Sequence, residues 1–187
     1  MTSTAYHRRR AGRSRRRTIV VLVAIVLLLV GMYHLAHWWH GQSIDRSLAQ
    51  YESLIRKHAG RNGLSPGLVS SVIRAESGGD RRAVSRAEAK GLMQITPIAQ
   101  KEVMQKTDLG DGDLFGPDYN IAIGTAYLRL MMERFDDNRW LALAAYNAGP
   151  GRISKLRRRY PDLSGKELVL RHAPSQTRAY VQQILGD

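Results

Sequence analysis

The chain has 187 residues and no cysteine, which excludes disulfides, thiolate metal sites, a cysteine nucleophile and a lipoprotein anchor. Its 43% hydrophobic and 24% charged residues are typical of a globular protein rather than a disordered one. The net charge is +13, but seven arginines lie in residues 1–17, and the remaining 22 basic and 16 acidic residues leave only +6. We therefore expect no nucleic-acid partner.

A basic tail, residues 1–17, precedes a long apolar segment. Twelve apolar residues run without a break from Ile19 to Val30, and the apolar character continues to Ala36. A helix over this segment would be roughly 27 Å long, close to the hydrocarbon core of a bilayer at about 30 Å. The sequence therefore predicts one transmembrane helix over residues 18–40.

The flanking residues predict the orientation of this helix. The positive-inside rule assigns residues 1–17 to the cytoplasm, and Tyr33, Trp38 and Trp39 suit the aromatic belt at the other interface. We expect a single-pass protein of the inner (cytoplasmic) membrane with residues 41–187 in the periplasm. A cleaved signal peptide is the alternative, but the apolar run exceeds the usual length and no A-x-A site follows.

Three histidines, His34, His37 and His40, recur every third residue at the end of the apolar segment. At this spacing the side chains drift around a helix, and no carboxylate lies nearby. We interpret them as interfacial polar residues. We predict no metal site and no cofactor.

Residues 41–187 carry short amphipathic patterns with start and stop signals, and no alternation typical of strands. Ser65-Pro66 and Thr96-Pro97 each combine an N-cap with proline at the first helical position. The expected helices are Ser43–His58, Pro66 to Gly78, Pro97–Gln105, Tyr119–Phe135, Arg139–Asn147, a short basic helix ending near Arg159, and Gln176–Leu185. We predict a mainly α domain with a loop over Thr107–Asp118.

Glu76 is the most informative residue of this domain. It follows Val72 by four residues and Ile73 by three, so its carboxyl shares the apolar face of its helix. Apolar surroundings and the helix end at Gly78-Gly79 both disfavour the charged form and should raise the pKa. A protonated glutamic acid suits general-acid cleavage of an ether-like bond. An ordinary surface glutamate is the alternative.

Two further clusters could line a binding site. Gly91 permits close backbone approach, Met93 is an adaptable apolar side chain, and Gln94 can both donate and accept hydrogen bonds. Tyr146 and Asn147 lie where a helix stops at Gly149-Pro150-Gly151, so their polar ends are free to reach a ligand. Taken alone, a methionine such as Met93 is more often a core residue than a site residue.

Four short motifs occur in order: Ala75-Glu76-Ser77-Gly78, Gly91-Leu92-Met93-Gln94, Ala145-Tyr146-Asn147-Ala148-Gly149 and Arg178-Ala179-Tyr180-Val181. Over roughly residues 50–185 the chain resembles the family 1 lytic transglycosylases of the soluble lytic murein transglycosylase type. That family is related in fold to goose-type lysozyme, so the resemblance implies a lysozyme-like helical domain after the transmembrane helix.

The resemblance also implies roles. Glu76 matches the single catalytic acid/base of the family. The residues that match its substrate-binding positions are Ser77, Gly91, Met93, Gln94, Tyr146, Asn147 and Tyr180. Glu88, where the family often has glycine, and Gln176, where it often has glutamate, depart from the pattern and leave the local loop shape and C-terminal packing open.

The implied reaction is cleavage of the bond between N-acetylmuramic acid and N-acetylglucosamine in peptidoglycan, with closure of a 1,6-anhydro ring. Its implied partners are glycan strands, and the sequence leaves cell-wall or secretion machinery open. Three other functions remain: a lysozyme-like hydrolase of the same bond, a catalytically silent peptidoglycan-binding module, and a basic DNA-binding protein at the membrane.

Overall fold

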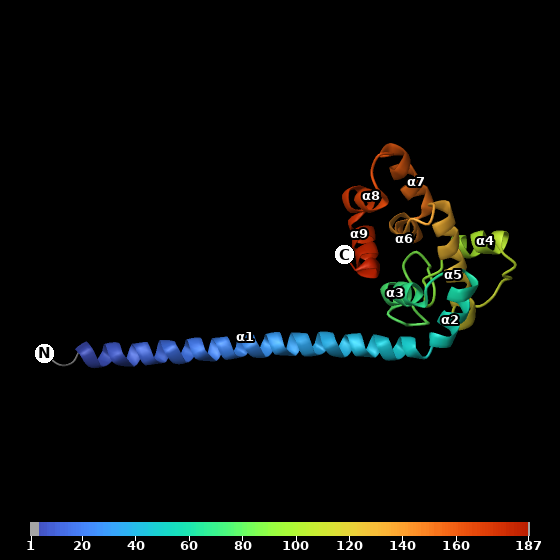
Figure 1. Ribbon diagram of the computed structural model, residues 1–187. Helices are drawn as coiled ribbons and strands as arrows, with labels where there is room; N and C mark the ends of the chain where they lie inside the picture. The colour runs from blue at the N-terminus through green and yellow to red at the C-terminus, as the bar shows by residue number, and fades with distance from the viewer. Residues whose placement is uncertain (1–3, 187) are drawn as a thin grey trace. The chain divides into compact units, whose positions relative to one another are not determined.

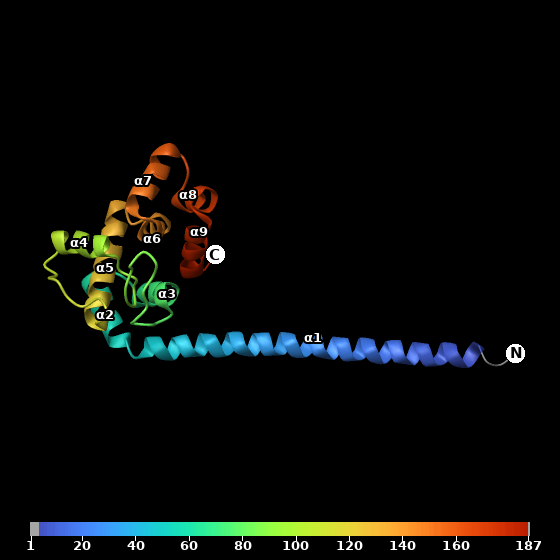
Figure 2. The same cartoon turned by 180° about the vertical axis from the view of Figure 1, so that it is seen from behind.

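The computed structural model describes residues 4–186, and the side chains of residues 1–20, 37, 40 and 43 are outside the described part. The chain divides into two compact units, Met1–Asp45 and Arg46–Asp187. Figure 1 shows the helices in chain order, and Figure 2 shows them from behind. The candidate site lies in the second unit.

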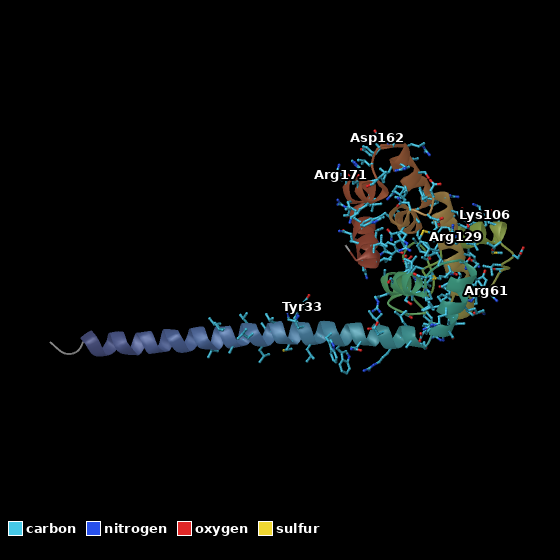
Figure 3. All side chains as sticks on the ribbon, viewed as in Figure 1. Tyr33, Arg61, Lys106, Arg129, Asp162 and Arg171 are labelled. Atoms are coloured by element: carbon cyan, nitrogen blue, oxygen red, sulfur yellow. The ribbon has the colours of Figure 1, made fainter. Side chains whose placement is uncertain are left out.

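The first unit consists of most of α1, a helix of 46 residues over Thr4–Ala49. Large apolar side chains from Val21 to Leu35 are exposed along it, together with Trp38 and Trp39. Figure 3 draws these side chains and labels Tyr33 among them. The predicted helix start at Ser43 is wrong, because α1 continues through this residue.

The membrane span predicted over residues 18–40 receives no support from the structure. Among the residues whose side chains are described, no helix combines the length and the apolar character that crossing a bilayer requires. The side chains of residues 18–20, 37 and 40 are outside the described part, as are those of the basic tail over residues 1–17. The prediction for the three histidines therefore cannot be followed at His37 or His40.

The second unit is mainly helical, as predicted. Its helices are α2 (Glu52–Arg61), α3 (Pro66–Ser77), α4 (Pro97–Lys106), α5 (Pro117–Arg134), α6 (Arg139–Ala148), α7 (Pro150–Arg159), α8 (Gly165–His172) and α9 (Ser175–Leu185). In the described part of the chain, pairing of extended backbone is limited to two isolated bridges, Val84 with Lys90 and Lys90 with Ile95. These bridges shape the loop between α3 and α4.

Helices α5 and α6 form the centre of this unit. Helix α5 packs against α2, α4 and α6, and α6 also contacts α7, α8 and α9. The sequence explains this position, because α5 buries eleven of its eighteen residues and α6 buries Leu141 through Ala145. Helices that are apolar around most of their circumference belong in a core.

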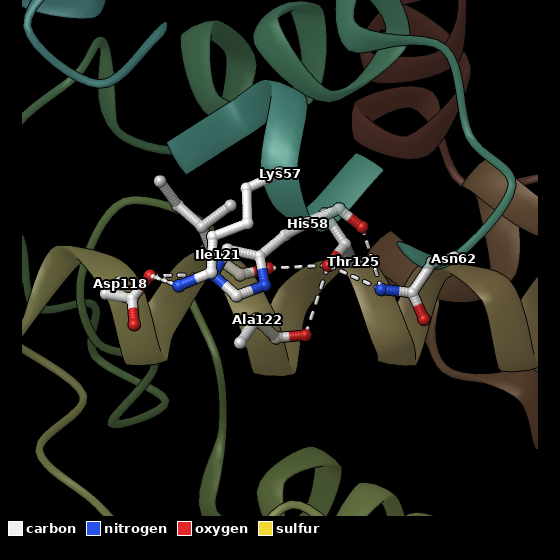
Figure 4. A network of polar contacts seen from close by, with 7 residues as sticks. All are labelled: Lys57, His58, Asn62, Asp118, Ile121, Ala122 and Thr125. Carbon is white, nitrogen blue, oxygen red and sulfur yellow. Dashed lines mark hydrogen bonds and ion pairs between the residues drawn. The ribbon is translucent and has the colours of Figure 1, made fainter. Parts of the chain in front are cut away.

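Helix α2 is attached to α5 by a polar network (Figure 4). The buried His58 ring shares a hydrogen bond of 2.8 Å with Asp118, and Lys57 pairs with the same carboxylate at 2.8 Å. Asn62 donates to the His58 carbonyl at 2.9 Å and to Thr125 at 3.0 Å. The hydrogen bonds with Lys57 and His58 hold the pKa of Asp118 below its ordinary value, and the one from Lys57 has the larger effect.

Candidate active site

Glu76 lies in the last turn of α3, one residue before the helix ends. The helix starts as predicted, with the Ser65 side chain accepting a hydrogen bond from the Leu68 N–H at 3.2 Å. It ends at Gly78, whose left-handed backbone (φ 61°) no other residue type adopts as easily. Val72 and Ile73 are fully buried one turn earlier. The half-buried Glu76 carboxyl therefore continues the apolar face of α3.

Burial raises the pKa of Glu76 from 4.5 to about 7. The Tyr180 hydroxyl acts in the opposite direction and lowers the pKa, because a donated hydrogen bond stabilises the carboxylate. The effect of burial is the larger one. At neutral pH the carboxyl is thus close to half protonated, which suits a group that must first give and then take a proton.

Two tyrosines approach this carboxyl from different helices, Tyr146 from α6 and Tyr180 from α9. Burial raises the pKa of both phenols well above the usual value, and the negative charge of Glu76 raises them further. The buried Tyr180 hydroxyl has no partner with full hydrogen-bond geometry among the described residues, so its contact with Glu76 is a loose one. Such contacts often tighten only when a substrate is bound.

The loop that carries the Gly91-Leu92-Met93-Gln94 motif is tied to α3 and α6 through consecutive carbonyls. Ser77 donates to the Leu92 carbonyl at 2.8 Å and accepts from the Gly79 N–H at 3.1 Å. The Tyr146 hydroxyl donates to the Met93 carbonyl at 2.8 Å. The loop is therefore held by both α3, which carries Glu76, and α6.

The side chain of Asn120, near the start of α5, also holds this loop. Its side-chain oxygen accepts from the Met93 N–H at 2.8 Å, and its amide nitrogen donates to the carbonyls of Lys90 and Leu114 at 2.9 and 2.8 Å. Gly91 has a left-handed backbone (φ 77°), and a Cβ there would collide with Asn120 and with the Leu114 carbonyl. Glycine at this position is thus required by a close approach.

Met93 and Gln94 take different positions in the loop. The Met93 side chain is fully buried, and it packs so closely on Gly124 of α5 that no Cβ would fit there. Gln94 has a left-handed backbone (φ 48°), and its amide nitrogen donates to the carbonyls of Ala83 and Gly91 at 3.1 and 3.0 Å. The side-chain oxygen of Gln94 has no hydrogen bond with the described residues, so it remains available as an acceptor.

Asn147 connects α6 with α9. Its side-chain oxygen accepts from the Thr177 hydroxyl at 2.9 Å, which leaves the amide nitrogen available as a donor. Thr177 precedes Tyr180 by one helical turn, and both are buried on the same face of α9. The hydrogen bond therefore fixes the face of α9 from which Tyr180 reaches Glu76.

The structure thus gathers the predicted site residues in one region, although their contacts with a substrate stay predictions. Ser77 and Met93 use their polar atoms within the protein, and the buried Met93 side chain does not reach a surface. Sequence reasoning missed Asn120 and Thr177. The signals for them in the sequence are weak: Asn120 is a polar residue next to the apolar stripe of α5, and Thr177 lies one helical turn before Tyr180.

Two other acids near the motifs have separate roles. Asp80 accepts a hydrogen bond from the Arg82 N–H at 2.8 Å and so stabilises the turn after α3. Glu88 is exposed and adopts a left-handed backbone (φ 58°). Glycine adopts this conformation most easily, and the loop keeps its turn here with glutamate.

Comparison with known proteins relates this geometry to a family. Residues 53–169 match the family described as Transglycosylase SLT domain. The soluble lytic murein transglycosylase of Salmonella typhimurium is 30% identical over 168 residues, which cover 80% of this chain and 26% of that protein. The membrane-bound lytic murein transglycosylase C of Histophilus somni is 32% identical over 159 residues, covering 72% of this chain and 44% of that protein.

Solved structures agree with the sequence relatives. Lytic transglycosylase Slt from Pseudomonas aeruginosa, solved as an inactive glutamate-to-glutamine mutant, matches with a TM-score of 0.66 and 30% identity and covers 80% of this chain and 27% of that one. The 70 kDa soluble lytic transglycosylase in complex with bulgecin A matches with a TM-score of 0.68 and 26% identity, covering 82% and 28%. The chain spans less than half the length of each of these relatives. Over residues 53–169 it belongs to the transglycosylase SLT domain family.

Proposed function

We propose that this chain is a lytic transglycosylase that cleaves the β-1,4 bond between N-acetylmuramic acid and N-acetylglucosamine in peptidoglycan. The observation that carries the proposal is the Glu76 carboxyl, whose pKa burial raises to about 7. The names of the related proteins, all lytic transglycosylases, support the reaction type.

In the first step, protonated Glu76 donates its proton to the glycosidic oxygen, and the bond from this oxygen to C1 of the muramoyl residue breaks. The N-acetylglucosamine side leaves as an alcohol. The muramoyl 2-acetamido group stabilises the positive charge that develops at C1, as in other substrate-assisted glycosidases. Because the substrate supplies this assistance, the proposed mechanism needs only one acid from the protein. Asp80 is not required as a second acid, and it stabilises the turn after α3.

In the second step, Glu76 is a carboxylate and acts as the base. It removes the proton of the muramoyl C6 hydroxyl, whose oxygen attacks C1 and closes the 1,6-anhydro ring. Proton and electron pair balance without water, and Glu76 returns to its protonated form. A pKa near the working pH serves both steps, and the intramolecular attack gains from proximity.

The remaining predicted site residues have supporting roles in this proposal. Tyr180 and Tyr146 flank the carboxyl, and their phenols stay protonated because burial raises their pKa values. The free donor of Asn147 and the free acceptor of Gln94 suit the amide and hydroxyl groups of the sugars. Ser77, Gly91 and Met93 act as positioning residues, through the hydrogen bonds that hold the loop.

The test is mass analysis of the soluble products after digestion of purified sacculi. We expect 1,6-anhydromuramic acid ends. Reducing muramic acid ends, one water heavier, would contradict ring closure and indicate a hydrolase.

Replacement of Glu76 by glutamine keeps the shape of the side chain but removes the proton that it donates, so release of products should fall by about 10³-fold or more. Binding without cleavage by the unmodified chain would indicate a silent module.

We also propose that residues 18–40 attach the chain to the inner membrane, with the domain on the periplasmic side. The support comes from the apolar sequence, from the exposed apolar side chains of α1, which range from 47% for Val30 to 66% for Leu27, and from a relative that is itself named membrane-bound. Exposed apolar surface of this extent needs a covering, which lipid would supply.

A further inference from the structure

A second polar feature of the domain is a cavity of about 300 Å³ that is separate from the Glu76 region. It lies where the end of α5, the start of α6 and one face of α7 meet. We call it the basic cavity. Its polar lining consists of Arg134, Asp136, Asn138, Ser154, Arg157 and Arg158. The volume is at the lower end of the range for small-ligand sites, enough for one small polar group and its neighbours.

Three guanidinium groups converge on this cavity, against one acid. Arg134 already pairs with Glu102 at 2.9 Å, and Arg157 donates through Nη1 to the Leu163 carbonyl at 2.8 Å. Arg158 is exposed and has no ion pair or hydrogen bond with any residue that the structure describes. Asp136 is the acid. The cavity thus retains an excess of positive charge and unused N–H donors.

The rest of α7 increases this positive charge. The helix contains five basic residues and no acidic one, and only Ile153 is buried. Arg152, Lys155 and Arg159 are exposed and make no ion pair with the described residues. Some cations elsewhere in the domain are neutralised, as Arg129 is by Glu133 and Asp137 at 3.0 and 2.9 Å. An unneutralised helix attracts anions over several ångströms.

The neutral groups of the cavity select the kind of anion. Asn138 uses its side-chain oxygen to cap α6 through the Leu141 N–H at 3.1 Å, so only its amide donor remains. Ser154 adds a hydroxyl that has no hydrogen bond with the described residues. Paired N–H groups of arginine match the two oxygens of a carboxylate, and flanking donors strengthen such binding.

We propose that the basic cavity binds a carboxylate of the stem peptides of peptidoglycan, so that the domain holds the wall at a second point away from Glu76. This inference rests on the proposed function, because it takes peptidoglycan as the substrate. A hollow lined by guanidinium groups suits one extended peptide end. A lipid surface would instead meet a broad and flat patch.

The test compares binding of the full chain, made non-cleaving by Glu76→Gln, to three targets: intact sacculi, sacculi whose carboxylates have been converted to amides, and vesicles that contain anionic phospholipid. The double variant Arg157→Gln/Arg158→Gln should bind intact sacculi about tenfold more weakly. Amidation of the wall should weaken the parent chain to the same extent and leave the double variant unchanged.

The matched control is Arg61→Gln/Lys101→Gln, which removes the same charge from exposed positions on α2 and α4; Figure 3 labels Arg61. It should change binding less than twofold. The single variant Arg158→Gln, which loses no internal hydrogen bond, excludes a folding defect. Equal loss in variant and control, or loss on vesicles with unchanged binding to sacculi, would overturn the proposal.

A separate cleavage assay tests the proposed function. With Glu76 restored, the Arg157→Gln/Arg158→Gln chain should cleave peptide-free glycan strands at the parent rate, because those strands have no stem carboxylate. If the parent and the double variant both cleave these strands and also bind sacculi equally well, only the proposal for the basic cavity is refuted. Absence of cleavage by the parent chain refutes the proposed function.

Discussion

At the scale of single residues, the pKa of Glu76 reflects two opposing effects, burial and the Tyr180 hydroxyl. In the proposed mechanism, the first chemical step needs the protonated carboxyl. We therefore expect kcat/KM on sacculi to fall above about pH 7, approaching tenfold per pH unit at higher pH. A pH–rate profile measures this. A rate that stays constant up to pH 9 would contradict the acid role of Glu76.

Replacing Tyr180 by phenylalanine removes the group that lowers the pKa of Glu76. The pKa should rise further, so the alkaline fall in kcat/KM should move to higher pH, while the maximum rate drops. Tyr127→Phe is the matched control, because Tyr127 packs on Tyr146 with ring centroids 5.3 Å apart. Its hydroxyl is not among the groups that shift Glu76. An unmoved profile in Tyr180→Phe would show that the loose contact has no electrostatic role.

The same carboxyl should make stability depend on pH. Its pKa is higher in the folded chain, about 7, than the ordinary 4.5, so folding favours the protonated form. The stabilising contribution is complete below about pH 4.5 and is lost as pH rises through 7. Ionised Glu76 then costs up to about 3 kcal/mol relative to the acid. Urea unfolding of Glu76→Gln and the parent should therefore diverge between pH 5 and 8, with the variant more stable at pH 8.

At the scale of elements, Asn120 shows how one buried amide organises a loop. Replacement by alanine leaves the Met93 N–H and the Leu114 carbonyl without partners, and the Lys90 carbonyl keeps only the Ile95 N–H. Stability should fall by roughly 3 kcal/mol, and kcat should fall because the loop beside Glu76 loosens. Denaturant unfolding and steady-state rates measure the two effects. Asn62→Ala, which loses one hydrogen bond to Thr125 of α5 and one to the His58 carbonyl of α2, should lower stability with little change in kcat.

Helix ends were predictable where the sequence carries its own signal. Ser65, Thr96 and Asn138 cap α3, α4 and α6 through their side chains, as their positions before each helix indicated. The missed helix is α8, although Ser164 and Glu167 form a capping box that the sequence displays. Its eight residues are too few for a clear apolar period. The break between α1 and α2 at residues 50–51 lacks any glycine or proline, so no local signal marked it.

The acid of the site was easier to predict than its support. Glu76 could be found because spacing from Val72 and Ile73 fixes its face on α3. Asn120 and Thr177 could not, since their partners lie 27 and 30 residues away in the chain. Met93, which the resemblance matches to a substrate-lining position, has a side chain that packs on Gly124 and is buried, as a methionine taken alone most often is.

At the scale of the whole molecule, the property to test is attachment to the membrane through residues 18–40. The full chain should stay in the membrane pellet after carbonate washing and dissolve only with detergent. Arginine at both Val26 and Leu27 should release it, because each costs about 3 kcal/mol at the centre of a spanning helix. Gln42→Arg, beyond the apolar run, is the control. Extraction of the parent chain by carbonate alone would contradict a membrane span.

The double attachment of the Leu92 and Met93 carbonyls also has a mechanical consequence. Hydroxyls from two different helices, α3 and α6, hold neighbouring peptide groups of one loop. Movement of this loop as a lid would break these two hydrogen bonds or carry the ends of both helices with it. We therefore expect a conformational change at the site to hinge outside the loop, and a displacement of α3 or α6 to move the neighbouring Gln94 as well.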